Sequence, residues 1–158
     1  MPIPEGFGIT ESDLHDEVIE NDLRAAKQPE AHILEQVDAH NYPHDCRFAI
    51  KLALEEALTN AVKHGNRGDR SKKLVVRYYV DDERVVIAVR DEGCGFCPDE
   101  VPDPTADENL ERPNGRGIML MQAYMTRVWF NERGNEVWML KLKHEAPKDA
   151  TACDTEHA

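Results

Sequence analysis

Hydrophobic and polar residues recur along this chain with two different periods, and these periods divide it into helices and strands. Apolar residues return every three or four positions in residues 25–42 and 46–65, which predicts two helices. Runs of β-branched and aromatic residues predict strands at residues 14–23, 74–80 and 84–90. The last two strands are separated by a short acidic turn, so they form a predicted hairpin.

The rest of the pattern completes a recognisable class of fold. Residues 118–125 predict a third helix, and residues 126–143 predict a final hairpin that turns near Arg133 and Gly134. This order predicts an α+β fold, a two-layer α/β sandwich with helices on one face of a mainly antiparallel mixed sheet.

The second predicted helix has the clearest boundaries. Leu54, Leu58 and Ala61 form its apolar stripe, Asp45 suits the N-cap, and Gly65 suits the residue that ends the helix. We expect one domain over residues 14–143. The N-terminal segment, residues 1–13, is expected to be flexible, and the polar tail, residues 144–158, is expected to be disordered. Residues 91–115 read as a loop, longer than compact domains usually keep without a function.

Charge and hydropathy exclude several classes of partner. The net charge of -12 argues against nucleic acid, because phosphate binding depends on clustered Lys and Arg. No apolar run approaches the roughly 20 residues that cross a bilayer, so no membrane contact is expected. The first residues lack a signal-peptide pattern, and we expect a cytoplasmic protein.

The four cysteines leave one alternative open. Cys46 and Cys153 stand alone, whereas Cys94 and Cys97 form a C-x-x-C that could hold zinc or act as a redox pair. A zinc site needs a second pair or spaced histidines, and none is evident. Reduced thiols are the simpler interpretation.

Three short motifs could carry chemistry, although no P-loop and no eukaryotic kinase motif occurs. Glu56 and Asn60 stand four residues apart on one helix face, where a carboxylate and an amide oxygen could act as a base and a Mg²⁺ ligand. A solvated helix face is the alternative.

The second motif, DEGCGF, follows directly on a predicted strand. Asp91 is a candidate acceptor for an amino group such as that of adenine, and Gly93 and Gly95 let the backbone approach a ligand closely. An ordinary turn would use the same residue types. In the third motif, NGRGIMLM, Gly115 and Gly117 open a helix whose free N–H groups favour phosphate.

Together these motifs resemble those of the Bergerat-fold ATPases of the GHKL superfamily, and among them the bacterial anti-sigma-factor serine/threonine kinases. EEALTNAVKHGN is similar to the family's N box, DEGCGF to its first glycine box and NGRG to its second. The resemblance covers roughly residues 14–143.

The resemblance implies ATP and Mg²⁺ as cofactors and assigns a role to each motif. It makes Glu56 the catalytic base, Asn60 the magnesium ligand and Asp91 the residue that recognises adenine. Arg112, with Arg116 as its rival, would reach the terminal phosphate. The remaining residues that it places around the nucleotide are His64, Gly93, Gly95, Gly115 and Gly117.

The same resemblance implies a function and partners. The protein would phosphorylate a small anti-sigma-factor antagonist and sequester a sigma factor. Homodimers are common in the family, and nothing in this sequence shows one. Two alternatives stay open: a regulatory module that binds ATP and a partner without phosphotransfer, and an ATPase that uses water. One departure is visible, because Asn135 follows Gly134 where relatives often carry threonine.

Overall fold

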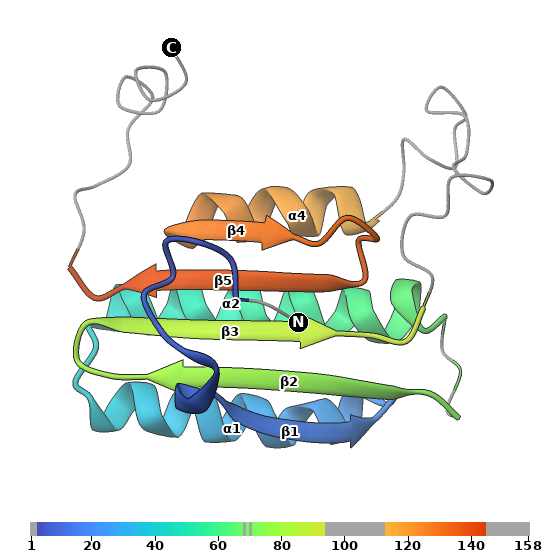
Figure 1. The fold of residues 1–158 in the computed structure, drawn as a ribbon, viewed down its shortest axis with the longest axis horizontal. Helices are drawn as coiled ribbons and strands as arrows, with labels where there is room; N and C mark the ends of the chain where they lie inside the picture. Colours follow the sequence, from blue (N-terminus) through green and yellow to red (C-terminus); the bar gives the residue numbers. More distant parts are fainter. Residues whose placement is uncertain (1–2, 68, 70, 94–112, 145–158) are drawn as a thin grey trace, which may run out of the picture.

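A five-stranded sheet backed by helices forms the body of the molecule (Figure 1). The computed structural model describes residues 3–67, 69, 71–93 and 113–144. In chain order the elements are β1 (His15–Glu20), α1 (Leu23–Ala39), α2 (His44–Asn60), β2 (Lys73–Val80), β3 (Arg84–Arg90), α4 (Pro113–Tyr124), β4 (Arg127–Phe130) and β5 (Glu136–Leu142). The strand order is β1-β2-β3-β5-β4, and each described ladder is antiparallel. The α+β prediction is confirmed, with an antiparallel rather than a mixed sheet.

The main core lies between the sheet and the helices. Strand β2 alternates as its sequence predicts, with Leu74, Val76, Tyr78 and Val80 buried and the residues between them partly exposed. Central strand β3 is different, because Val85–Val89 are buried without alternation. Both faces of the sheet are therefore covered at its centre.

Helix α2 begins and ends differently from the prediction. Pro43, not Asp45, occupies the N-cap position, and Asp45 lies in the first turn, where its charge favours the helix dipole. At its other end α2 continues directly into a π-helix, Ala61–Gly65. Gly65 is the last residue of that helix, but its φ is not in the left-handed region that a glycine C-cap uses.

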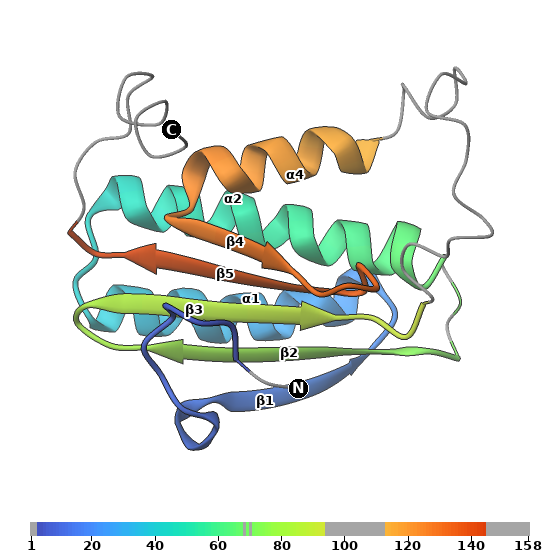
Figure 2. The same ribbon diagram turned by 45° about the horizontal axis from the view of Figure 1, so that its top comes forward.

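The outer face of the sheet is covered by the N-terminal strap, which we define as residues 3–13. Phe7 is fully buried and meets Trp138 of β5 edge to face, with ring centroids 6.1 Å apart. Arg84 donates to the carbonyl of Phe7 at 3.0 Å, and Arg127 donates to that of Glu5 at 3.1 Å. Figure 2 shows the strap in dark blue across the sheet, on the side away from the helices.

The hydrophobic pattern of the sequence did not predict that the strap packs on the sheet. Gly6 and Gly8, on either side of Phe7, have positive φ values of 86° and 74°. A Cβ on either glycine would collide with the guanidinium of Arg127 or Arg84. These glycines therefore allow the two arginines to hold the backbone beside Phe7.

The ends of the two helices and the strand that carry the motifs lie at the same end of the molecule. Figures 1 and 2 both show the C-terminal end of α2, the C-terminal end of β3 and the first turn of α4 on the same side. Helices α2 and α4 pack against each other. This arrangement brings the sequence motifs into one region.

Candidate nucleotide site

The C-terminal half of α2 presents two acidic residues with different surroundings. Glu55 pairs with Lys27 of α1 at 3.4 Å, and the hydrogen bond it shares with Glu30 is the main cause of its lowered pKa. Glu56, one residue on, projects about 100° away around the helix. Glu56 and Asn60 are both half-buried, and no ion pair to another described residue involves Glu56. The structure thus separates a structural glutamate from the predicted catalytic one.

The π-helix widens the end of α2 at the site. Such helices are rare and occur often at functional sites. Its closing bond runs from the N–H of Asn66 to the carbonyl of Ala61, at 2.8 Å. The exposed His64 lies in this segment, so the structure places it beside the other predicted residues of the N box.

Asp91 is a buried carboxyl group with a raised pKa. It is 8% exposed, and it accepts a hydrogen bond from the N–H of Gly93 at 2.8 Å. Burial raises the pKa of its carboxyl to about 6, since that bond and the positive charge of Lys72 offset burial only in part. A buried carboxyl with spare acceptor capacity suits a ligand that brings a hydrogen-bond donor.

Two glycines allow the ends of α2 and β3 to touch. A Cβ on Gly65 would lie 2.1 Å from Oδ2 of Asp91, and a Cβ on Gly93 would lie 2.0 Å from the carbonyl oxygen of Gly65. Real atoms do not approach so closely. Gly65 is therefore required for space beside Asp91, a role that the sequence analysis, which assigned it to ending the helix, did not predict.

The turn between β4 and β5 supports the Asp91 segment from the other side. The N–H of Asp91 donates to the carbonyl of Asn135 at 2.9 Å. The Asn135 amide reaches the carbonyls of Asp91 and Gly93 at 3.4 and 3.5 Å, and Asn131 accepts from the N–H of Asn135 at 3.0 Å. Asn135 thus contacts the backbone at Asp91. Only its departure from the family motif marked it in the sequence.

Several predicted residues cannot be compared with the structure. Gly95, Arg112 and the C-x-x-C pair Cys94 and Cys97 lie outside the described residues. Gly115, Arg116 and Gly117 belong to the first two turns of α4, which begins at Pro113, a favoured residue for a first helical position. Their assignments to phosphate binding stay predictions.

A search of the described residues finds no cluster of three or more His, Cys, Asp or Glu side chains that could hold a metal ion. The described helices also include none with the length and apolar character needed to cross a bilayer.

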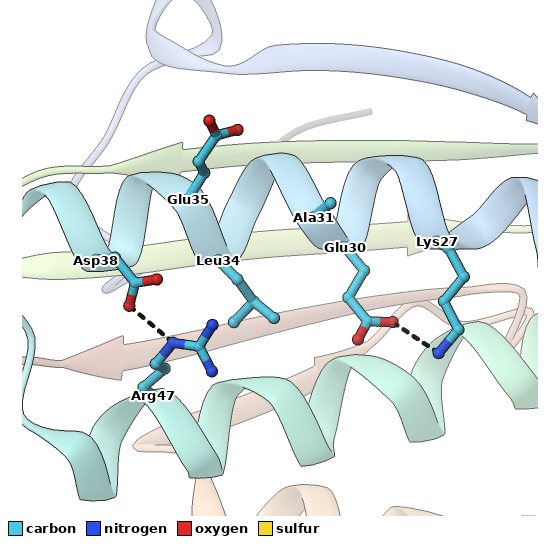
Figure 3. Close-up of a pocket in the computed structure, with 7 residues that line it drawn as sticks. All are labelled: Lys27, Glu30, Ala31, Leu34, Glu35, Asp38 and Arg47. Carbon is cyan, nitrogen blue, oxygen red and sulfur yellow. Dashed lines mark hydrogen bonds and ion pairs between the residues drawn. The ribbon is translucent and has the colours of Figure 1, made fainter.

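A groove of about 510 Å³ lies elsewhere, between α1 and α2 (Figure 3). Four of its charged side chains form pairs across it or within α1: Arg47 contacts Asp38 at 2.7 Å, and Lys27 contacts Glu30 at 3.6 Å. Of the predicted site residues that the structure describes, none lines this groove.

Comparisons with known proteins agree with the motifs and the fold. Residues 19–141 match the family described as "Histidine kinase-like ATPase domain". The chain is 32% identical over 108 residues to the "Anti-sigma F factor" of Geobacillus thermodenitrificans, covering 66% of this chain and 73% of that protein. It is 33% identical over 109 residues to "Serine-protein kinase RsbW" of Bacillus subtilis, covering 63% of this chain and 67% of that protein.

A solved structure adds an independent comparison of the fold. The RsbU and RsbW domains of Rv1364c from Mycobacterium tuberculosis match with a TM-score of 0.56 at 18% identity. The match covers 87% of this chain and 34% of that longer chain, and it shows the fold alone. From the family match and the sequence relatives, this chain belongs to the histidine kinase-like ATPases, in the group of the anti-sigma factors and serine-protein kinases.

Proposed function

We propose that this protein binds ATP with Mg²⁺ and is a serine/threonine protein kinase of the anti-sigma-factor type. The observation that carries the proposal is the buried Asp91 carboxyl held against Gly65, at the end of the helix that bears Glu56 and Asn60. An acceptor in this place suits the amino group of adenine. The names of the relatives support a protein as the phosphate acceptor, since one relative is named a serine-protein kinase and another an anti-sigma factor.

Each residue then has a distinct task. Asp91 accepts from the adenine amino group, while the first turns of α4 offer backbone N–H groups to the phosphates. The amide oxygen of Asn60 would hold Mg²⁺, which prefers oxygen ligands and usually takes few of them from the protein. Bound Mg²⁺ supplies neutralisation of the triphosphate charge. Glu56 takes the proton from a serine hydroxyl of the protein substrate.

The proposed substrate is a small anti-sigma-factor antagonist, and the proposed second partner is a sigma factor. The net charge of -12 is consistent with protein partners rather than nucleic acid.

The test separates binding from transfer. Calorimetric titration with ATP and Mg²⁺ should show magnesium-dependent binding that Asn60→Ala weakens. Glu56→Gln should keep this affinity and lose, by about a hundredfold or more, phosphate transfer to purified antagonist proteins from the same organism. Glu55→Gln is the matched control, since Glu55 pairs with Lys27 and should not affect transfer.

The alternatives predict other outcomes. ATP binding with no transfer to any antagonist would instead support a regulatory module that binds without phosphorylating. Phosphate release with no partner present would support an ATPase. Absence of ATP binding by the unmodified protein would contradict all three functions.

A further inference from the structure

A closed ring of hydrogen bonds lies directly behind the Asp91 turn, and none of its members has a role assigned by the sequence motifs. Asn66 follows the π-helix and is fully buried. Its Oδ1 accepts from the N–H of Glu92 at 2.8 Å, and its Nδ2 donates to the carbonyl of Lys73 at 3.1 Å. The N–H of Lys73 donates to the Glu92 carboxylate, which closes the ring.

Asn21, the residue after β1, extends this ring to a further strand. It is 2% exposed, and its Oδ1 accepts from Nδ2 of Asn66 at 3.0 Å. Its own Nδ2 donates to the carbonyl of Asp69 at 3.1 Å. The network therefore joins the ends of β1 and the π-helix to the start of β2 and to the residue after Asp91.

Backbone groups fix the orientation of both amides. The Glu92 N–H can only donate, and the Lys73 carbonyl can only accept, so Asn66 cannot be flipped without losing both bonds. The Asp69 carbonyl fixes Asn21 in the same way, and its oxygen then faces the Asn66 donor. A buried polar network with its main groups satisfied specifies one geometry.

That geometry is the one that holds Asp91. Asn66 is bonded to Gly65 in the chain, and Gly65 lies against the Asp91 carboxylate. The Asn66 side chain holds the N–H of Glu92, which is bonded to Asp91 on its other side. One side chain thus sets the separation between the π-helix and the Asp91 turn.

We propose that Asn66 is a positioning residue of the nucleotide site, which fixes the Asp91 carboxylate where it meets the base of the nucleotide. This inference rests on the proposed function, because it assigns to Asp91 the recognition of adenine. Asn66 acts through its bond to the Glu92 N–H, and Asn21 keeps Asn66 in place.

The test uses two variants that damage the network differently. Asn66→Ala removes the acceptor for the Glu92 N–H together with both donors. Asn66→Asp keeps that acceptor but sets a carboxylate against the oxygens of Asn21 and Lys73, so it should be the less stable variant. ATP and GTP affinities, measured by calorimetry with Mg²⁺, would be compared with unfolding midpoints in urea.

If Asn66 positions Asp91, Asn66→Ala lowers ATP affinity by about tenfold or more and reduces the preference for ATP over GTP. Asn66→Asp retains more of that preference in spite of its lower stability. The matched control is Tyr42→Phe, which deletes a partly buried hydrogen bond of 2.7 Å to the carbonyl of Asp81, at the other end of β3. It should lower stability with no change in either affinity.

Two results would overturn the inference. One of them leaves the proposed function standing, and the other overturns it as well. If the unmodified protein binds ATP and the affinities of all variants simply follow their stabilities, Asn66 is structural and the proposed function stands. If the unmodified protein does not bind ATP, the proposed function fails and the inference fails with it. Should neither Asn66 variant fold, Asn21→Ala decides, because it removes the acceptor that keeps Asn66 in place. A reduced preference for ATP over GTP then supports the inference, and an unchanged preference overturns it.

Discussion

Two aspartates at opposite ends of β3 differ in how the fold satisfies their carboxylates. Asp81 precedes the strand and accepts from the N–H groups of Glu83 and Arg84 at 2.7 and 2.8 Å. The hydroxyl of Tyr79 donates to its other oxygen at 2.6 Å. Burial alone would raise the pKa of Asp81, but these bonds outweigh it and lower the pKa.

Asp91 follows the strand and has the opposite balance. Its carboxylate accepts one described hydrogen bond, from Gly93, and burial raises its pKa to about 6. Among the described residues, the carboxylate of Asp81 therefore accepts three hydrogen bonds, whereas that of Asp91 accepts one. In the part of the chain that the structure describes, Asp91 thus has fewer hydrogen-bond donors than Asp81, and this difference supports the proposal that Asp91 accepts from a ligand.

Among residues that are not themselves proposed to touch the nucleotide, the largest effect should come from closing the space beside Asp91. Gly65→Ala places a Cβ on the Asp91 oxygen, so the carboxylate must move by about an ångström, and misplacements of that size cost roughly a hundredfold. We expect ATP affinity to fall by that factor in calorimetry. Stability should fall by about 1–3 kcal/mol in urea unfolding.

Gly8→Ala is the control for that variant. It forces a side chain onto a positive φ of 74° against the Arg84 guanidinium, far along the chain from the predicted site residues. It should destabilise the protein and leave ATP affinity unchanged. Equal ATP binding by Gly65→Ala and the unmodified protein would contradict the assigned geometry.

A pair of amide substitutions should change stability in opposite directions. A raised carboxyl pKa means that Asp91 stabilises the fold most below its ordinary value of 3.8 and loses that contribution as pH rises through about 6. At pH 8, Asp91→Asn should therefore stabilise the protein, by about 1–3 kcal/mol, while abolishing ATP binding. Urea unfolding at pH 8 and pH 5 measures the gain, which should shrink at pH 5.

Asp81→Asn should do the reverse. Its lowered pKa gives a contribution to stability that is present above pH 4 and lost as pH falls further, so the substitution should cost about 1–2 kcal/mol at pH 8. ATP affinity should not change. Destabilisation by both substitutions at pH 8 would remove the distinction between the two aspartates.

The smallest effect should come from Asn135. Its amide contacts the carbonyls of Asp91 and Gly93 at 3.4 and 3.5 Å, which are long for hydrogen bonds. Asn135→Ala should weaken ATP binding about two- to fivefold, equivalent to roughly 0.5–1 kcal/mol. A loss as large as that of Gly65→Ala would mean that Asn135, rather than the Gly65 clearance, positions the turn.

Periodicity predicted the order of elements because each strand and helix buries a face that its sequence already displays. The stripe of Leu54, Leu58 and Ala61 is buried as expected. A mainly antiparallel mixed sheet was expected, and each described ladder is antiparallel. The π-helix was also missed, because one wider turn leaves no mark on the apolar spacing around Ala61.

At the site, the sequence predicted the types of the candidate residues but not the contacts that hold them in place. Asp91 followed a strand in the sequence, and a carboxylate there suggested an acceptor. Asn66 and Asn21 are 45 residues apart in the sequence, and neither was assigned a role, because buried polarity arises only when distant segments meet. Gly65 was read as a local helix signal, whereas its contact is with a residue from another element.

The contact between Phe7 and Trp138 also gives the molecule an optical reporter. Trp138 is fully buried under the N-terminal strap and donates to Glu136 at 3.1 Å, whereas Trp129, the other tryptophan, is 38% exposed. Indole emission moves to longer wavelength when water reaches the ring. In a Trp129→Phe background, detachment of the strap would therefore be visible as a red shift in fluorescence, in unlabelled protein and in real time.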